Sequence, residues 1–513
     1  MFSKFILLLH WILRPVDKFL DKLTSYRLVL YFLLTVLGWS MLASLITDQV
    51  PFRWYEILGS AAWLVAVCRA SNWSISYLLN IPRNQESDLI TALILALILN
   101  PASDLAGFFL LAAAGSIAMI SKYLLVIGRR HVFNPAALGA LTVGPLLGFY
   151  ASWWVGLSTL TPIILLGGML IVRKMRRYLM VSVFMSLYLA IVAVETQGGS
   201  SQIINSWWTV LTASPVLFFV YVMLLEPLTS PKRPYRASAY AGLVALMYGL
   251  PGLGLAPEAA LLIGNLAAFL LEPGRRLVLA YAGKVKEADG LYSFIFSSKH
   301  RVRFQAGQYM EWTIPANRSD SRGNRRYLTI SSAPTEEQLM VTVRQPSPAS
   351  RFKQKLKAFK PGDKILASPP AGSFVAPVDP AQKIVMVAGG VGITPFRSMV
   401  KSWLDTNQRR DAVLIYAANH YSEFAFTDLF KAASAIGVQT TYIITDPQKV
   451  PAGWRGQQGS VSGQLIKASV PDYRQRIFYV SGPYGFVSAV RDSLLKKGVS
   501  LAKIRTDYFP GYG

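Results

Sequence analysis

The stretch KIVMVAGGVGITP, residues 383–395, decides the fold of the C-terminal half of the chain. Its apolar part, residues 384–388, has the length and composition of a buried β-strand, and it runs into a glycine-rich turn. A Thr-Pro pair then begins a helix. Such a turn lets backbone approach a pyrophosphate, whose negative charge is favoured at the start of a helix. The cofactor-binding residues that this stretch predicts are Gly389, Gly390, Val391, Gly392, Ile393, Thr394 and Pro395.

Further apolar runs place this strand and helix in a larger sheet. The last run enters Ser481-Gly482-Pro483, a second glycine turn, so the ends of two strands can line one cleft. We therefore expect an α/β doubly wound nucleotide-binding domain over residues 380–513, with Gly482 and Pro483 as further cofactor contacts. The additional strands are expected at residues 412–417, 440–444 and 477–480.

Alternating apolar and polar residues precede this domain. The alternation is typical of short strands in an antiparallel sheet, and it predicts a small β-barrel over residues 277–379. The expected strands include residues 292–296, 307–313, 326–332 and 339–344.

A barrel followed by a nucleotide-binding domain, with these motifs, resembles the ferredoxin NADP reductase superfamily. In that family an Arg-x-aromatic-Ser/Thr strand binds FAD or FMN, and Arg326-Tyr327-Leu328-Thr329 occupies the motif here. The resemblance implies that Arg326 grips the flavin phosphate and that Thr329 hydrogen-bonds near the reactive flavin nitrogen. Leu328 stands where the family usually has Tyr or Phe, so ring stacking at this position is weakened.

Two further segments complete the flavin site that the resemblance implies. Val343 and Arg344 match the second flavin segment, and Ser350 matches the third, which contacts the pyrophosphate through backbone amides. The implied cofactors are FAD, or FMN in its place, together with NADH or NADPH. Residues 416–422, at the end of the second nucleotide-domain strand, hold neither a clear acid nor a clear arginine, so the sequence favours neither dinucleotide.

The residues expected nearest the hydride path depart from the family in one place. The family often has Cys before the Gly-Pro turn, and Ser481 stands there in this chain. Ser481 need not block hydride transfer, because the stacked rings of the two cofactors supply the chemistry. Near the chain end, Tyr508 or Phe509 is the candidate shield of the flavin face, with a packing role as an equal alternative. Together with Thr329, these are the candidate catalytic residues.

Residues 28–276 are too apolar for a soluble domain. The whole chain is 52% hydrophobic with a mean hydropathy of +0.36, and apolar stretches fill most of this region. Residues 1–27 mix apolar and charged residues, which predicts an interfacial helix. We expect a polytopic α-helical domain of about ten spans, several of them short, at residues 28–46, 56–79, 88–100, 104–127, 133–149, 152–172, 178–194, 208–225, 237–250 and 256–271.

The basic residues of this half predict an orientation. With the N-terminus inside, Arg53 alone falls in an external loop, and every basic cluster falls in the cytoplasm. We expect a multi-pass protein of the cell (inner) membrane with a cytoplasmic reductase domain. The net charge of +25 suits anionic lipid, an acidic partner or phosphate-rich cofactors, and no nucleic-acid partner is expected. The clusters are residues 129–130, 173–177, 232–236 and 275–276.

Two pairs of similar segments predict inverted repeats in the membrane half. Residues 97–103 resemble 224–230, and residues 132–137 weakly match 263–268, on spans of opposite direction. Such interrupted segments indicate half-helices that meet near the midplane and can bind a ligand. The alternative is that each proline only ends a helix.

The membrane half also resembles the D subunit of Rnf complexes and the B subunit of the sodium-pumping NADH:quinone oxidoreductase. The resemblance covers about residues 55–271 and implies paired inverted repeats of five helices. In the family a threonine of a polar loop carries FMN, but residues 148–154 are too short for that loop, so we expect no covalent FMN. The matching segments are residues 87–97, 132–139, 164–168 and 226–231.

Cysteine and histidine content limits the electron carriers of the chain. The single cysteine, Cys68, excludes an iron–sulfur cluster held by this chain alone, because such a cluster needs about four thiolates. The histidines are scattered over different segments, so we expect neither haem nor another metal site.

These observations lead to one main functional hypothesis. We expect a membrane-bound flavoprotein oxidoreductase that takes a hydride from NAD(P)H onto FAD and passes electrons to quinone, flavin or metal in or across the membrane. Other membrane subunits are candidate partners. The alternative is a vitamin or ion transporter with a fused regulatory or cargo-modifying reductase. A ferric reductase or NADPH oxidase type of enzyme is disfavoured, because paired histidines are missing.

Overall fold

The computed structural model describes residues 15–17, 19–20, 23–78, 85–127, 130–272, 276–314, 324–345 and 349–509. Two compact units share the chain, Pro15–Arg275 and Arg276–Gly513, and each is described by itself. Of the segment expected to be an interfacial helix, residues 1–14 lie outside the described residues.

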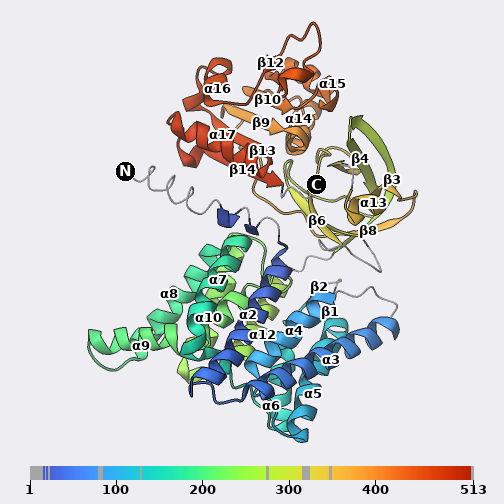
Figure 1. Ribbon diagram of the computed structural model, residues 1–513. Helices are drawn as coiled ribbons and strands as arrows, with labels where there is room; N and C mark the ends of the chain where they lie inside the picture. The colour runs from blue at the N-terminus through green and yellow to red at the C-terminus, as the bar shows by residue number, and fades with distance from the viewer. Residues whose placement is uncertain are drawn as a thin grey trace. The chain divides into compact units, whose positions relative to one another are not determined.

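The first unit is a bundle of helices (Figure 1), and each expected span overlaps one of them. The bundle contains one irregular stretch, in which α10 continues directly into the π-helical turn Phe219–Leu224. The helices are α2 (Ser25–Ile46), α3 (Trp54–Leu78), α4 (Gln85–Ile98), α5 (Leu105–Leu124), α6 (Pro135–Leu147), α7 (Thr161–Met175), α8 (Tyr178–Glu195), α9 (Ser200–Thr212), α10 (Val216–Phe218), α11 (Pro234–Gly249) and α12 (Pro257–Leu271).

The prediction of ten full spans is not supported. Four helical segments of the described residues are long and apolar enough to cross a membrane, and a fifth results if α9 and the segment Val216–Leu224, bent by 58°, form one span. Helices such as α4 and α6, with 14 and 13 residues, reach only about 20 Å, whereas the hydrocarbon layer is about 30 Å thick. The four segments are Ser25–Ile46, Leu105–Leu124, Ser158–Met175 and Tyr178–Glu195.

Two of these short helices meet through polar side chains from the matched segments. The backbone N–H of Asn134, at the start of α6, donates to Oδ1 of Asn265 on α12 over 2.9 Å. The Nδ2 of Asn134 donates to Oε2 of Glu226 over 2.7 Å, and the Nδ2 of Asn265 donates to the Tyr240 hydroxyl over 3.1 Å. Backbone groups freed at helix ends are thus paired inside the bundle, as an apolar surrounding requires. The inverted repeat itself stays a prediction.

Two tryptophans close the end of α4. The indole N–H of Trp154 donates to the carbonyls of Ala96 and Leu99 over 3.1 and 3.0 Å. Trp153 has a left-handed backbone, with φ of 53°, and its indole N–H donates to Oε2 of Glu258 over 2.9 Å. The backbone N–H of Trp153 also donates to the carbonyl of Ile98 over 2.9 Å. Both residues belong to the segment 148–154, and they satisfy the last carbonyls of a short helix.

The second unit begins with a six-stranded antiparallel sheet, as predicted. Its strand order is β6-β5-β8-β3-β4-β7. The backbone N–H of Ser331, just beyond β6, donates to the carbonyl of Met340 on β7 over 2.8 Å, which joins the two edge strands and closes a barrel. The strands are β3 (Leu277–Ala288), β4 (Leu291–Ser297), β5 (Tyr309–Thr313), β6 (Arg325–Thr329), β7 (Leu339–Arg344) and β8 (Lys364–Ala367), with helix α13 (Arg351–Lys357) after β7.

A parallel sheet follows, with the order β12-β11-β10-β9-β13-β14. The chain crosses from one side of β9 to the other between β12 and β13, so the doubly wound arrangement is confirmed. The strands are β9 (Ile384–Gly389), β10 (Ala412–Ala418), β11 (Val438–Ile444), β12 (Gln457–Gln458), β13 (Ile477–Pro483) and β14 (Ile504–Phe509), and the helices are α14 (Thr394–Asp405), α15 (Thr427–Ala432), α16 (Gly463–Ser469) and α17 (Tyr484–Lys496).

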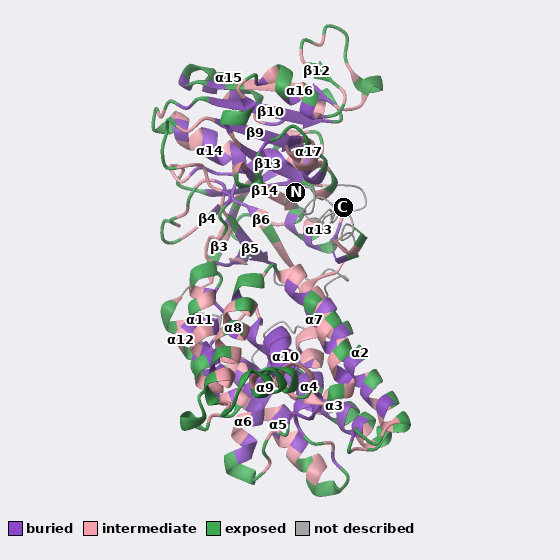
Figure 2. Cartoon of the chain, turned by 90° about the vertical axis from the view of Figure 1, so that its left-hand side faces the viewer, coloured by how far each residue is buried: buried purple, intermediate pink, exposed green. Residues whose placement is uncertain are grey.

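Strand β9 is buried on both faces, which explains its continuous apolar run. Met386 packs with Phe396 of α14 in one cluster, and Val387 packs with Val490 of α17 in another. Figure 2 shows β9, β10 and β13 as buried, with α14 and α17 on either side of the sheet. The carboxyl ends of β9 and β13 lie at the edge of the sheet, and the two glycine turns lie there too.

We expect Asn265→Leu to destabilise the first unit. The substitution leaves the backbone N–H of Asn134 without its acceptor in a buried place, which costs about 1–3 kcal/mol. The thermal unfolding midpoint in detergent should fall, whereas Asn205→Leu, at an exposed position on α9, should leave it in place. Equal midpoints for the two variants would contradict this role of Asn265.

Candidate functional site

The glycine turn lies at the carboxyl end of β9. A short 3₁₀ turn, Gly390–Ile393, connects the strand to α14. Gly390 has a left-handed backbone with φ of +54°, a conformation that glycine adopts without strain. A Cβ on Gly392 would lie 2.2 Å from the carbonyl oxygen of Ser481, so the turn and β13 touch backbone to backbone. This close approach explains why a side chain is missing at position 392.

Strand β13 is longer than predicted and includes the second glycine turn. It runs through Ser481 to Pro483, because β14 pairs with it there and supplies hydrogen bonds as far as Phe509. Ser481 is fully buried, opposite Ala388 of β9. Its hydroxyl has no hydrogen-bond partner among the described residues. A buried hydroxyl at the meeting point of two glycine turns is suited to a ligand atom.

The predicted flavin strand is β6, which pairs with β5. The Arg326 guanidinium lies 5.2 Å from the centre of the Phe352 ring, and its Nη1 donates to the carbonyl of Arg325 over 2.7 Å. Leu328 packs against the barrel core, and Thr329 is buried. Tyr327 is exposed instead, and its hydroxyl donates to Oε2 of Glu311 over 3.0 Å. Alternation along the strand thus separates Arg326 and Leu328 from the aromatic ring of Tyr327.

The second and third predicted flavin segments lie at the ends of β7 and α13. Val343 is part of the barrel core, so only its backbone remains for a ligand. Arg344 forms an ion pair with Glu423, and its Nη1 lies 3.6 Å from the position that a Cβ would take on Gly390. Ser350 precedes α13, and its buried hydroxyl has no partner in the described part of the chain. Arg344 therefore reaches from the barrel to the glycine turn.

The chain end contributes one described ring near the second glycine turn. Tyr508 lies beside Gly482 in the β14–β13 pairing, and its ring meets Tyr484 edge-on at 5.3 Å. This contact gives Tyr508 a packing partner, and its role as a flavin shield stays a prediction. The Phe509 side chain lies outside the described residues.

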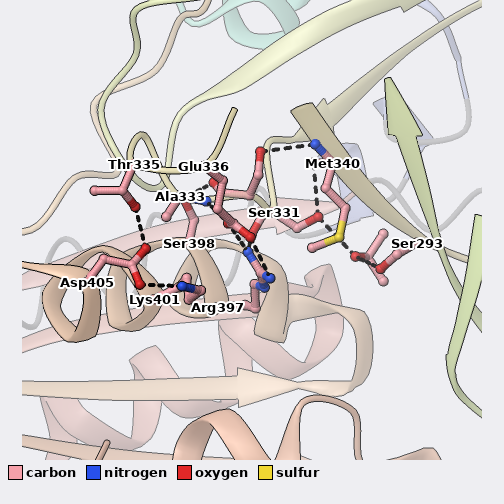
Figure 3. A network of polar contacts seen from close by, with 12 residues as sticks. Ser293, Ser331, Ala333, Thr335, Glu336, Met340, Arg397, Ser398, Lys401 and Asp405 are labelled. Atoms are coloured by element: carbon pink, nitrogen blue, oxygen red, sulfur yellow. Dashed lines mark hydrogen bonds and ion pairs between the residues drawn. The ribbon is translucent and has the colours of Figure 1, made fainter. Parts of the chain in front are cut away.

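A network of polar contacts joins the barrel to α14 (Figure 3). Arg397 forms a two-point ion pair with Glu336, in which Nη2 lies 3.0 Å from Oε1, and its Nη1 donates to the Ser331 carbonyl over 3.1 Å. The Ser398 hydroxyl donates to the carbonyl of Ser332 over 2.6 Å. None of these residues was singled out in the sequence, because Glu336 and Arg397 are 61 positions apart.

The far end of the same helix carries a second carboxylate contact. Burial would raise the pKa of Asp405, but hydrogen bonds from Lys401 and Thr335 hold it below its usual value. The carboxylate therefore stays ionised at neutral pH and accepts from the Thr335 hydroxyl at 2.5 Å. The loop between β6 and β7 thus contacts α14 near both ends of the helix.

The residues present fit the cofactors that the motifs imply. Ser350 and Ser481, which are predicted to lie at the flavin and the nicotinamide, respectively, each have a buried hydroxyl without a partner among the described residues. Gly390 presents bare backbone next to the Arg344 cation, which suits a diphosphate. FAD would be held by the β6 and α13 segments, and NAD(P)H by the two glycine turns.

Comparisons with known proteins agree with this arrangement of the second unit. Residues 386–492 match the family described as the oxidoreductase NAD-binding domain. The chain is 27% identical over 237 residues to the stachydrine N-demethylase reductase subunit Stc4 of Rhizobium meliloti, covering 45% of this chain and 66% of that protein. It is 27% identical over 241 residues to a glycine betaine monooxygenase reductase subunit of Pseudomonas aeruginosa, covering 46% and 64%.

A Bacillus cereus flavohemoprotein is 26% identical over 238 residues, which cover 44% of this chain and 59% of that protein. The chain thus spans 59–66% of the length of these relatives. Among solved structures, the Amycolatopsis cytochrome P450 reductase GcoB is similar with a TM-score of 0.41 at 19% identity, covering 46% of this chain and 71% of that one. The family match lies within the second unit and does not extend to the first.

We expect Gly392→Ala to weaken dinucleotide binding. The added Cβ would collide with backbone of β13, so the turn must move and lose a charge-assisted hydrogen bond to the diphosphate, which costs about 1.5–3 kcal/mol, or roughly 10–100-fold in affinity. The dissociation constant for NADH or NADPH, measured by titration, should rise accordingly while the flavin content stays. Gly283→Ala on β3, where the Cβ meets open space, is the matched control. An unchanged dissociation constant would remove this turn from the binding site.

Proposed function

We propose that the chain is a membrane-bound NAD(P)H-dependent flavin oxidoreductase. The observation that carries this proposal is the approach of the barrel to the first glycine turn: Arg344 of the barrel lies 3.6 Å from the Cβ position of Gly390. The same turn rests on the second glycine turn, where Gly392 contacts Ser481 of β13. A flavin held by the barrel and a nicotinamide held by the glycine turns would therefore share one interface. The similarity of residues 386–492 to oxidoreductase NAD-binding domains supports it.

The chain's own residues would bind and orient both cofactors. Arg326 and the α13 segment with Ser350 would hold the flavin phosphates, and Thr329 would hydrogen-bond near its reactive edge. Arg344 lies between the two phosphate sites, so it can neutralise charge on either side. Fully buried Ser481 would keep water away from the place where the rings meet. A bound flavin accepts a hydride and can release electrons singly, which suits one-electron acceptors.

We assign the electron acceptor to the membrane half or to a partner that it binds. The apolar helices support a location in the cell membrane, and the basic clusters support a cytoplasmic reductase. Quinone, a second flavin or a metal ion would serve as acceptor. This step rests on the resemblance to Rnf D and sodium-pumping NADH:quinone oxidoreductase B subunits.

A transporter with a fused reductase is the second candidate. One observation favours it, namely a polar centre inside the bundle. There Glu226 accepts from the side-chain amide of Asn134, and the backbone N–H of Asn134 donates to Asn265. Polar groups held inside a membrane domain commonly mark a transport or ligand site.

The test is purification of the full chain in detergent, followed by absorbance spectra before and after NADH or NADPH. Flavin that is bleached anaerobically by one of the dinucleotides is the expected result. Protein that holds no flavin would overturn the proposal. Acid precipitation then separates released from covalent flavin, and retained flavin would show that residues 148–154 do not exclude a covalent site.

We expect Arg326→Gln to reduce flavin binding. The loss of one charge-assisted contact to phosphate costs about 1.5–3 kcal/mol, which corresponds to a rise of roughly 10–100-fold in the dissociation constant of the flavin. The flavin-to-protein ratio and a fluorescence titration with FAD measure it. Arg303→Gln, at an exposed arginine of the same barrel, is the control and should bind flavin normally. Equal affinities would place the flavin phosphate elsewhere.

A further inference from the structure

The contact between Arg397 and Glu336 occupies a specific place relative to the two predicted cofactor sites. Arg397 is the third residue after Thr394, where α14 begins directly beyond the glycine turn. Its acceptor Ser331 is the second residue after Thr329, the last residue of the flavin strand. The contact therefore joins the two cofactor-bearing segments, with two residues between Thr394 and Arg397 and one between Thr329 and Ser331.

Several groups over-determine the position of Arg397. Both guanidinium Nη atoms reach the Glu336 carboxylate, and the Glu336 Oε2 also accepts from the backbone N–H of Ala333 at 2.5 Å. The Arg397 side chain retains only 12% of its accessible surface. Its guanidinium lies 5.7 Å from the Phe426 ring, on the loop between β10 and α15. A partly shielded two-point pair is stronger and more directional than an exposed one.

A second contact, one residue further along both segments, fixes the same register. The hydroxyl of Ser398 donates to the Ser332 carbonyl, and the Ser332 hydroxyl accepts from the backbone N–H of Met340 over 3.0 Å. Both serines are buried. Rotation of α14 against the barrel would break this contact and the Arg397 pair together, because they lie on adjacent residues (Figure 3).

We infer that Arg397 and Glu336 are positioning residues for hydride transfer, setting the distance and angle at which the nicotinamide-bearing turn faces the flavin-bearing strand. This inference rests on the proposed function. Hydride transfer depends steeply on donor–acceptor geometry, so a small rotation of α14 lowers the rate before it lowers binding of either cofactor. A joint that served stability alone would instead leave the rate per bound flavin unchanged.

The test is anaerobic stopped-flow reduction of the flavin-loaded full chain in detergent, over a range of NADH or NADPH concentrations. Glu336→Gln keeps the size and one acceptor oxygen but removes the charge. The limiting reduction rate per bound flavin should fall about tenfold or more, while the dissociation constant of the dinucleotide and the flavin content stay. The deuterium isotope effect with 4-deuterated dinucleotide should rise, as hydride transfer becomes more fully rate-limiting.

Two further variants keep the test decisive. Ser398→Ala removes the neighbouring contact and leaves the ion pair in place, so it should lower the limiting reduction rate by a smaller factor. It replaces Glu336→Gln in the test if that variant does not retain flavin. Glu337→Gln, the same change at the exposed neighbouring residue of the loop, is the matched control and should reduce at the wild-type rate.

The outcomes distinguish the positioning role of the ion pair from the proposed function of the chain. A wild-type rate and isotope effect in both Glu336→Gln and Ser398→Ala, even with a lowered unfolding midpoint, would overturn the positioning role alone. Failure of the unmodified chain to bind flavin or to be reduced would overturn the proposed function and this inference with it. Variants that change only the dinucleotide dissociation constant would assign the pair to binding and also overturn the inference.

Discussion

The Arg397–Glu336 ion pair is the interaction on which the arrangement of the second unit depends. The barrel and the parallel sheet each have a hydrophobic core, and they share an apolar contact where Phe374, beyond β8, packs on Phe396 of α14. Such burial is non-directional, so it does not by itself set the angle between them. Directional contacts supply that information, since a two-point ion pair is satisfied in one orientation. The neighbouring hydroxyl contact of Ser398 removes the remaining freedom of rotation.

The backbone contact at Gly392 supports the turn that directly precedes α14. Because residue 392 has no side chain, the glycine turn can rest directly on β13 beside Ser481. The start of α14 is therefore held between this contact and the barrel loop that carries Glu336. A turn supported on both sides is preorganised for a diphosphate, which reduces the ordering cost of binding.

In the first unit the main constraint is different: helices end inside an apolar bundle, so the backbone groups at their ends need hydrogen-bond partners there. Trp154 closes the end of α4, and Asn265 accepts the first free N–H of α6. These contacts explain why segments that resemble full spans in hydropathy are short helices. An end that is satisfied by a distant side chain does not need to reach the membrane surface.

The sequence by itself determined the local features of this protein. The apolar run of β9, the glycines after it and the alternation in the barrel predict strands and turns, because these follow from short-range sterics and burial periodicity. Tertiary structure alone decided the number of long spans, the extension of β13 through Pro483, and the partners of Arg344 and Arg397. Each of these depends on residues dozens of positions away, whose meeting is set by packing of whole elements, and no local pattern encodes it.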